Sequence, residues 1–412
     1  MREAGPNIGT SPAASPGPVA ERTARVAPAI FVDAFSTIGQ PRGAAFAPDP
    51  LRRKVADAMA RFDGIVIAEA PTAGAKPLSW SEYRFAGSLE YHEDGTTTLG
   101  FRLIDMSDGT VVWSRTFPRL HVEGDAGALE EAILREVVPA VAQPFGIVWT
   151  RELASHRVTD ARRACILDAI EYWRSFNPAR HEVVRQCLER LAAQEPRYAP
   201  VYSGLALVYL RDFFLDIAHQ GEMPALDRGL QFAEHAVELR PHSARAHDML
   251  STIWFARGET DLGFGAVKRA IELNPYDTNI IATYGAHLVS IGEVDRGLAM
   301  LDDAGARSTV GQSWFEFYRF LARYLKGDVA GASLHASMIV GSDSLYSALA
   351  HAVLAGRTGD TATADLAVGR LIALNPAWRT EPKRQLAKFF PATEIRERLL
   401  QDLHAAGIPP TD

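Results

Sequence analysis

Two prolines, Pro241 and Pro275, stand 34 positions apart in this 412-residue chain and close almost the same phrase. The first phrase reads AVELRP and the second reads AIELNP. Between the prolines lie two apolar-periodic runs of helical length, which are joined at Gly258. This spacing predicts a hairpin of two helices as a repeating unit, and such a unit is stable only when it stacks on further copies.

The unit resembles the tetratricopeptide repeat, a helical hairpin with a period of 34 residues. With Ala244 as its first position, Leu250 and Ser251 match the family's Leu-Gly pair and Trp254 takes the large aromatic position. Weaker copies keep turn glycines at Gly292, Gly327 and Gly359 and small packing residues at Gly297, Ala304, Ala332 and Ala364. The resemblance implies an all-α, right-handed solenoid over 160–376, followed at 377–412 by a capping helix (381–407) and a tail.

Residues 28–150 show a different pattern, in which short β-like runs alternate with helical ones. Strands are expected over 28–37, 65–68, 83–90, 96–104 and 110–117, and helices over 49–62 and from 125 onward. The pairs Asp94-Gly95 and Asp108-Gly109 predict hairpin turns. Pro139 should kink or end the second helix near Val138. The expected fold class is therefore α+β: a small mixed α/β domain with an antiparallel sheet, followed by the helical solenoid.

The stretch from Tyr83 to Phe117, with the phrases GFRLID and DGTVVWSR, resembles the small domain related to the N-terminal domain of TolB. In many bacterial regulators this domain precedes tetratricopeptide repeats and follows a winged-helix or class III nucleotide cyclase domain. Neither of those upstream domains is expected in this chain. The resemblance implies a role in bacterial signalling or transcriptional regulation.

Composition limits the partners and the location that we expect. Lys and Arg total 43 against 50 acidic residues, a net charge of −7, so we expect no direct contact with nucleic acid. Residues 1–27 are rich in Pro, Ala, Ser and Gly and should form a disordered tail or linker. We find neither a signal peptide nor a run of about 18 apolar residues, so we expect no membrane partner and a cytoplasmic protein.

No pattern in the sequence indicates a catalyst, a metal site or a cofactor. His235, His242 and His247 lie close together but lack a metal-ligand motif, and we interpret them as solvated residues at helix ends. Phosphate-binding and nucleophile-elbow motifs are missing as well. Cys165 and Cys187 are interpreted as buried thiols, with a redox pair or metal site as the alternative; a single disulfide is disfavoured.

The candidate site is a groove lined by the first helix of each hairpin. By family position its partner-binding residues are Ser203, Leu207, Leu210, Asp248, Thr252, Phe255, Ala282, Ala286 and Val289. This mostly apolar lining suits an apolar helix or peptide. The aromatic segment 313–324 fills the core of a degenerate repeat or, alternatively, docks a partner.

We therefore predict a non-enzymatic scaffold that binds a protein or peptide in the groove. Two alternatives stay open. The chain could be the regulatory half of a nucleotide cyclase system, or it could sense a small ligand in the cleft between the α/β unit and the first repeats. The oligomeric state stays open too.

Overall fold

The computed structural model describes residues 27–410 except for the segments 42–45, 69–78, 123–125, 156–159, 176, 219–222, 309–311 and 342–343. The tail expected over 1–27 therefore lies outside the described residues, apart from Ala27. The N-terminal unit comprises β1 (Ala29–Val32), β2 (Ser36–Ile38), α2 (Pro48–Met59), β3 (Val66–Ala68), β4 (Glu82–Tyr91), β5 (Thr97–Asp105), β6 (Val111–Leu120), α3 (Ala126–Ala142) and α4 (Ile147–Ala154).

The sheet of this unit is mixed, which corrects the antiparallel sheet expected from the sequence. Its strand order is β3-β1-β4-β5-β6, and β2 also pairs with β4. β1 runs parallel to both β3 and β4. Its parallel pairing with β3 follows from α2, which lies between the two strands in the chain and acts as a crossover helix. β4, β5 and β6 are antiparallel, and the two predicted Asp-Gly turns join them.

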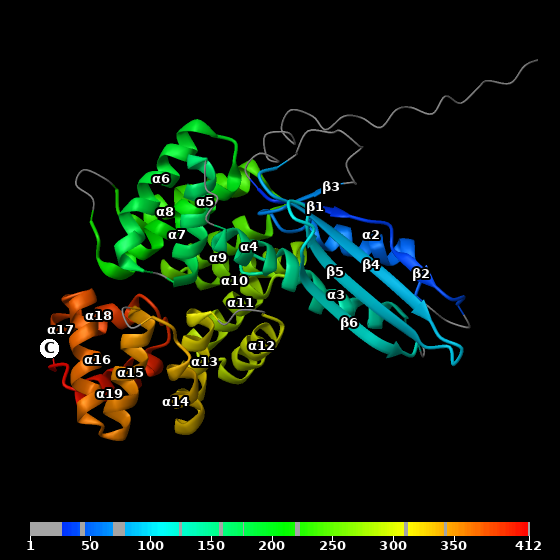
Figure 1. The fold of residues 1–412 in the computed structure, drawn as a ribbon. Coiled ribbons are helices and arrows are strands. Elements are labelled where there is room, and N and C mark those ends of the chain that lie inside the picture. The colour runs from blue at the N-terminus through cyan, green and yellow to red at the C-terminus, as the bar shows by residue number, and fades with distance from the viewer. Residues whose placement is uncertain are drawn as a thin grey trace, which may run out of the picture.

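One face of the sheet forms a core with α2 and α3 (Figure 1). Alternate side chains of β4 and β5, such as Phe85 and Phe101, point into it. α3 continues through Pro139 to Ala142 and does not end near Val138. Burial of the valines around Pro139 offsets the hydrogen bond that proline cannot donate.

The stretch Ala126–Ala154 has the length and apolar composition needed to cross a membrane, with a mean hydropathy of 1.2 in its most apolar window. In the folded chain, 72% of that window is buried. A core helix satisfies the same two criteria, so this stretch is weak evidence for a membrane span.

Paired helices make up the rest of the chain. They are α5 (Ala161–Ser175), the short η1 (Pro178–Arg180), α6 (His181–Gln194), α7 (Ala199–Leu215), α8 (Ala225–Leu239), α9 (Ala244–Ala256), α10 (Thr260–Leu273), α11 (Thr278–Ser290), α12 (Val294–Arg307), α13 (Ser313–Leu325), α14 (Val329–Ser337), α15 (Leu345–Thr358), α16 (Thr361–Leu374), α17 (Ala377–Thr380), α18 (Pro382–Ala387) and α19 (Thr393–Ala405). The predicted turn glycines, Gly258, Gly292, Gly327 and Gly359, all have positive φ, as these turns require.

The C-terminal cap is not the single helix expected over 381–407. It is broken into α18 and α19, because Pro391 lacks an N–H and disfavours helical geometry in the residue before it.

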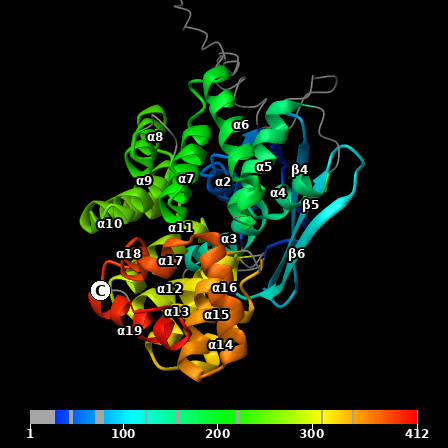
Figure 2. The same cartoon turned by 90° about the vertical axis from the view of Figure 1, so that its left-hand side faces the viewer.

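The array curls so that this cap reaches back to α7 (Figures 1 and 2). Asp216, just after α7, accepts hydrogen bonds from Arg384 and Gln385, and Phe214 stacks on Phe389 with ring centroids 4.3 Å apart. Burial raises the pKa of Asp216, but hydrogen bonds, above all from Lys388, outweigh it and hold that pKa at about 2. These contacts join the C-terminal cap to the end of α7.

Cys165 and Cys187 form a disulfide between α5 and α6, with Cα atoms 5.7 Å apart. This corrects the interpretation of two separate thiols. The spacing of the cysteines could not show that their positions face each other across two packed helices. Disulfides persist mainly in oxidising compartments. The cytoplasmic location therefore stays a prediction, and the redox state of this cysteine pair in the cell would test it.

We expect protein purified without reductant to contain no alkylatable thiol after denaturation. The bond closes a loop of 22 residues, so its reduction should lower the free energy of unfolding by about 3 kcal/mol. Alkylation with mass spectrometry and urea unfolding with and without reductant measure the two effects. A Cys165→Ser/Cys187→Ser variant is the control, and its free energy of unfolding should be the same with and without reductant. Two free thiols in the oxidised preparation would contradict the bond.

Candidate binding site

A cavity of about 90 Å³ opens among the first helices of successive pairs, and we call it the groove cavity. Its lining comes from α5, α7, α9, α11, α13 and α15: Trp173, Leu207, Leu210, Arg211, Phe214, Asp248, Met249, Thr252, Asn279, Thr283, Trp314, Tyr318 and Tyr346. Four of the nine predicted residues, Leu207, Leu210, Asp248 and Thr252, therefore lie together on this surface. That every lining residue is on a first helix agrees with the repeat register.

The other five predicted residues lie elsewhere. Ser203 lines a different cavity, described below, and Phe255 is buried with its ring stacked on His287, the centroids 3.9 Å apart. Ala282, Ala286 and Val289 are buried. Val289 packs against Gly297 of α12, where a residue with a side chain would clash. These positions contact neighbouring helices, which is why they do not reach the groove.

The aromatic segment 313–324 contains both core residues and residues that line the groove cavity. Phe317, Phe320 and Tyr324 are buried core residues. Trp314 and Tyr318, on the same helix, line the groove cavity.

The floor of the groove cavity is polar. Asp248 is 1% exposed, and its Oδ2 lies 3.6 Å from Nη1 of Arg245. Burial raises the pKa of Asp248 to about 6, against the opposing effect of Arg245. Among the described residues, neither Oδ1 of Asp248 nor Oδ1 of Asn279 receives a hydrogen bond. A buried acceptor without a donor is costly, so this floor is suited to a guest with N–H or O–H groups.

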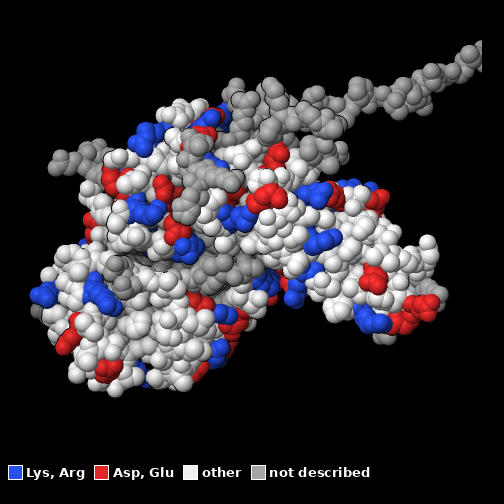
Figure 3. Space-filling view, in the orientation of Figure 1, with Lys and Arg blue, Asp and Glu red and all other residues white. Residues whose placement is uncertain are grey.

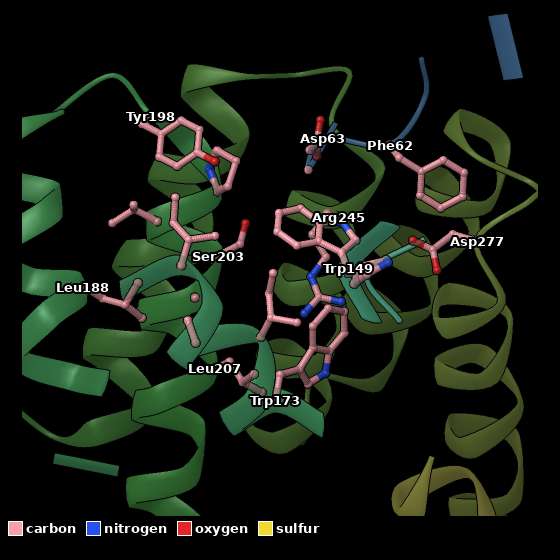
Figure 4. Close-up of a pocket in the computed structure, with 18 of the residues that line it drawn as sticks. Phe62, Asp63, Trp149, Trp173, Leu188, Tyr198, Ser203, Leu207, Arg245 and Asp277 are labelled. Atoms are coloured by element: carbon pink, nitrogen blue, oxygen red, sulfur yellow. The ribbon is translucent and has the colours of Figure 1, made fainter. Parts of the chain in front are cut away.

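A second cavity, of about 140 Å³, lies between the N-terminal unit and the first repeats, and we call it the inter-unit cavity. Phe62, Asp63 and Gly64, from the turn between α2 and β3, form one side. Trp149 of α4 and the helices α5, α6, α7 and α9 form the others (Figure 4). It shares the side chains of Trp173 and Leu207 with the groove cavity, so the two cavities are neighbours.

The rim of the inter-unit cavity ties the two parts of the chain together. Asp63 accepts a hydrogen bond from Ser243 and pairs with Arg240, whose Nη1 lies 3.1 Å away. Burial raises the pKa of Asp63, and both partners oppose that shift. Arg61 donates to the carbonyl of Leu273 at 2.9 Å. The turn after α2 is thus fixed to the loops that precede α9 and α11.

Arg245 projects into the inter-unit cavity from the first turn of α9 (Figure 4). Its guanidinium carbon is 3.1 Å from the ring centroid of Trp173. Burial lowers the pKa of Arg245 to about 10, although nearby carboxylates, above all Asp248, oppose that shift. Sequence reasoning did not select Arg245, although it is the second position of the best-formed repeat.

Within the described part of the chain, no group of three or more His, Cys, Asp or Glu side chains could hold a metal ion. The two cavities offer aromatic surfaces and hydrogen-bonding groups.

Comparison with known proteins finds distant likenesses. No family model matches the chain. The mouse interferon-induced protein with tetratricopeptide repeats 3 is 24% identical over 147 residues, 36% of this chain and 34% of that protein, so the chain spans about a third of that relative's length.

Two solved structures show how far the structural likeness extends. The human IFIT1 dimer solved with m7Gppp-AAAA is 15% identical, covers 58% of this chain and 59% of its own, and has a TM-score of 0.44. The pilF protein of Pseudomonas aeruginosa is 14% identical, covers 58% and 96%, and has a TM-score of 0.34. The 34-residue period and the paired helices described above give the helical part of this chain a tetratricopeptide-like fold.

Proposed function

We propose that this protein is a non-enzymatic scaffold whose helical array binds a protein or peptide partner in the groove cavity. The resemblance of 83–117 to a domain of bacterial regulators supports a setting in bacterial signalling or transcriptional control. On the face in Figure 3, basic and acidic side chains are interspersed, which supports a partner other than nucleic acid.

The observation that carries this proposal is that buried polar groups and aromatic side chains line the same cavity. Trp314, Tyr318 and Tyr346 offer apolar surface, while Asp248 and Asn279 each present an oxygen that receives no hydrogen bond within the described residues. A side chain with an apolar body and N–H donors at its tip matches both features. We therefore expect the partner to insert one such side chain as its anchor.

We expect Thr252→Trp to raise the Kd of a groove-binding peptide about tenfold or more, since the indole would occupy the groove cavity. Peptides are first selected from a random library on the immobilised full chain. Their affinities for wild type and variant are then measured by titration calorimetry.

Leu366→Trp is the matched control, because Leu366 lies on the second helix of its pair, α16, and is 65% exposed. It introduces the same side chain and should leave the Kd unchanged. Equal affinities for wild type and Thr252→Trp, or a library that yields no binder, would refute the groove as the partner site.

A further inference from the structure

The inter-unit cavity has the size of a small-molecule site. Its volume of about 140 Å³ is close to that of an engineered apolar cavity of about 150 Å³ that binds benzene. Trp149, Trp173, Leu188 and Leu207 contribute apolar walls (Figure 4). A single aromatic ring is therefore the body that this space accommodates.

At one end of the cavity, the buried Nη1 of Arg245 has no hydrogen-bond partner among the described residues. The side chain of Arg245 is 17% exposed, and the structure shows no hydrogen bond from it to any described residue. The nearest carboxylate oxygen, Oδ2 of Asp248, is 3.6 Å away, beyond hydrogen-bond distance. Stacking on Trp173 stabilises the charge but accepts none of the five N–H donors. A guest with an acceptor oxygen would satisfy this group.

The charges around Arg245 favour a neutral guest. Asp63 is already balanced by Arg240, whereas Asp248 and Asp277 both face the single charge of Arg245. An anionic head group would add a further negative charge beside these carboxylates, and a cationic head group would meet Arg245 itself. Asp277 lines the cavity, and a carboxylate can accept more than the bonds that Asn279 donates to it.

We propose that the inter-unit cavity binds a small neutral aromatic molecule with a carboxamide-like head group. The carbonyl oxygen accepts a hydrogen bond from Arg245, the N–H group donates to Asp277, and the ring lies among Trp149, Trp173 and Leu188. Because both parts of the chain form the walls, the bound molecule also stabilises the seam between the N-terminal unit and the first repeats. The inter-unit cavity adjoins the groove cavity, with which it shares Trp173 and Leu207, but this proposal does not require a peptide partner in the groove.

Four probes with one ring and different head groups test the proposal on the full chain: benzamide, benzoate, benzylamine and toluene. Titration calorimetry should show benzamide binding about tenfold more tightly than each of the other three, the effect of about 1.4 kcal/mol of added hydrogen bonding. Benzamide should also raise the melting temperature most. Equal affinities for the four probes, tighter binding of toluene or of a charged probe, or no binding of benzamide would overturn it.

Two pairs of variants separate the site from general effects on folding. Arg245→Met keeps the aliphatic stem and should reduce benzamide binding to the level of toluene, while toluene binding stays unchanged. Ser203→Phe should fill the cavity and abolish binding of all probes, whereas Ser203→Ala should bind as wild type does. If Arg245→Met does not fold, the Ser203 pair still decides whether this cavity is the site. Unchanged benzamide binding by Ser203→Phe would contradict the assignment.

Discussion

Replacing Gly356 by alanine should detach α19 from α15 and lower the free energy of unfolding by about 3 kcal/mol or more. A Cβ at this position would lie 1.8 Å from the carbonyl oxygen of Asp402 and 3.1 Å from the backbone nitrogen of Ala406. Both obstacles are backbone atoms of α19, so no side-chain rotation can relieve the overlap. The gain in helix propensity from Gly to Ala, about 1 kcal/mol, is too small to offset it.

Thermal unfolding and limited proteolysis measure this effect. We expect a lower melting temperature and new cleavage between α18 and the C-terminus. The matched control is Gly369→Ala in α16, where a Cβ would meet no atom within 4 Å. That variant should be unchanged or more stable by about 0.5–1 kcal/mol. Equal melting temperatures for the two variants would show that α15 and α19 do not pack as closely as described here.

No sequence pattern predicts the close approach of α15 and α19 at Gly356. Other close approaches between helices of the array fall at positions that recur in the repeat. Gly285 and Gly297 occupy recurrent positions of the repeat, and each is where a Cβ would collide with the backbone of the paired helix. The 34-residue period therefore predicts contacts between the two helices of one hairpin. Gly356 instead contacts α19, which lies beyond the last repeat, so the period does not predict this contact.

The repeat register also predicted part of the groove lining: Leu207, Leu210, Asp248 and Thr252 line the groove cavity, and the other five predicted residues do not. Family position led to Asp248, Thr252 and Phe255 and their counterparts one repeat later, which are mostly buried. Beside Asp248 and Thr252, the cavity linings use the second and sixth positions of successive first helices: Arg245 and Met249, Asn279 and Thr283, Trp314 and Tyr318. Phe255, Ala282, Ala286 and Val289 do not reach the groove cavity because they are buried against neighbouring helices.

The sheet and the disulfide show what hydrophobic patterns leave undetermined. The alternation of apolar and polar residues and the Asp-Gly pairs predicted β4, β5, β6 and their turns, because a hairpin is a local structure. The parallel pairing of β1 with β3 and β4 depends on where α2 returns the chain, which alternation does not encode. The Cys165–Cys187 bond likewise depends on how α5 and α6 face each other.

Removal of the Asp212 carboxylate is expected to cost about 3–5 kcal/mol of stability, the usual result when one member of a buried polar pair is deleted. Asp212 in α7 is 0% exposed, and its Oδ1 lies 2.6 Å from Nε2 of His181, the first residue of α6. Nδ1 of the same ring lies 2.6 Å from the hydroxyl of Tyr172 in α5. A neutral imidazole satisfies both contacts: the Tyr172 hydroxyl donates to Nδ1, and Nε2–H donates to Asp212.

Because this chain of bonds joins three helices, Asp212→Ala should loosen α5, α6 and α7 together. Urea unfolding measures the loss for Asp212→Ala and for Tyr172→Phe, which removes the hydroxyl bonded to Nδ1 of His181 and should cost about 1 kcal/mol. The matched control is Asp168→Ala, which breaks the exposed pair with Arg180 and should cost less than about 1 kcal/mol. If Asp212→Ala were no more costly than Asp168→Ala, the polar chain would contribute little to stability. The large difference we expect would instead show that the start of the array is fixed by buried polar contacts, which the repeat pattern does not specify.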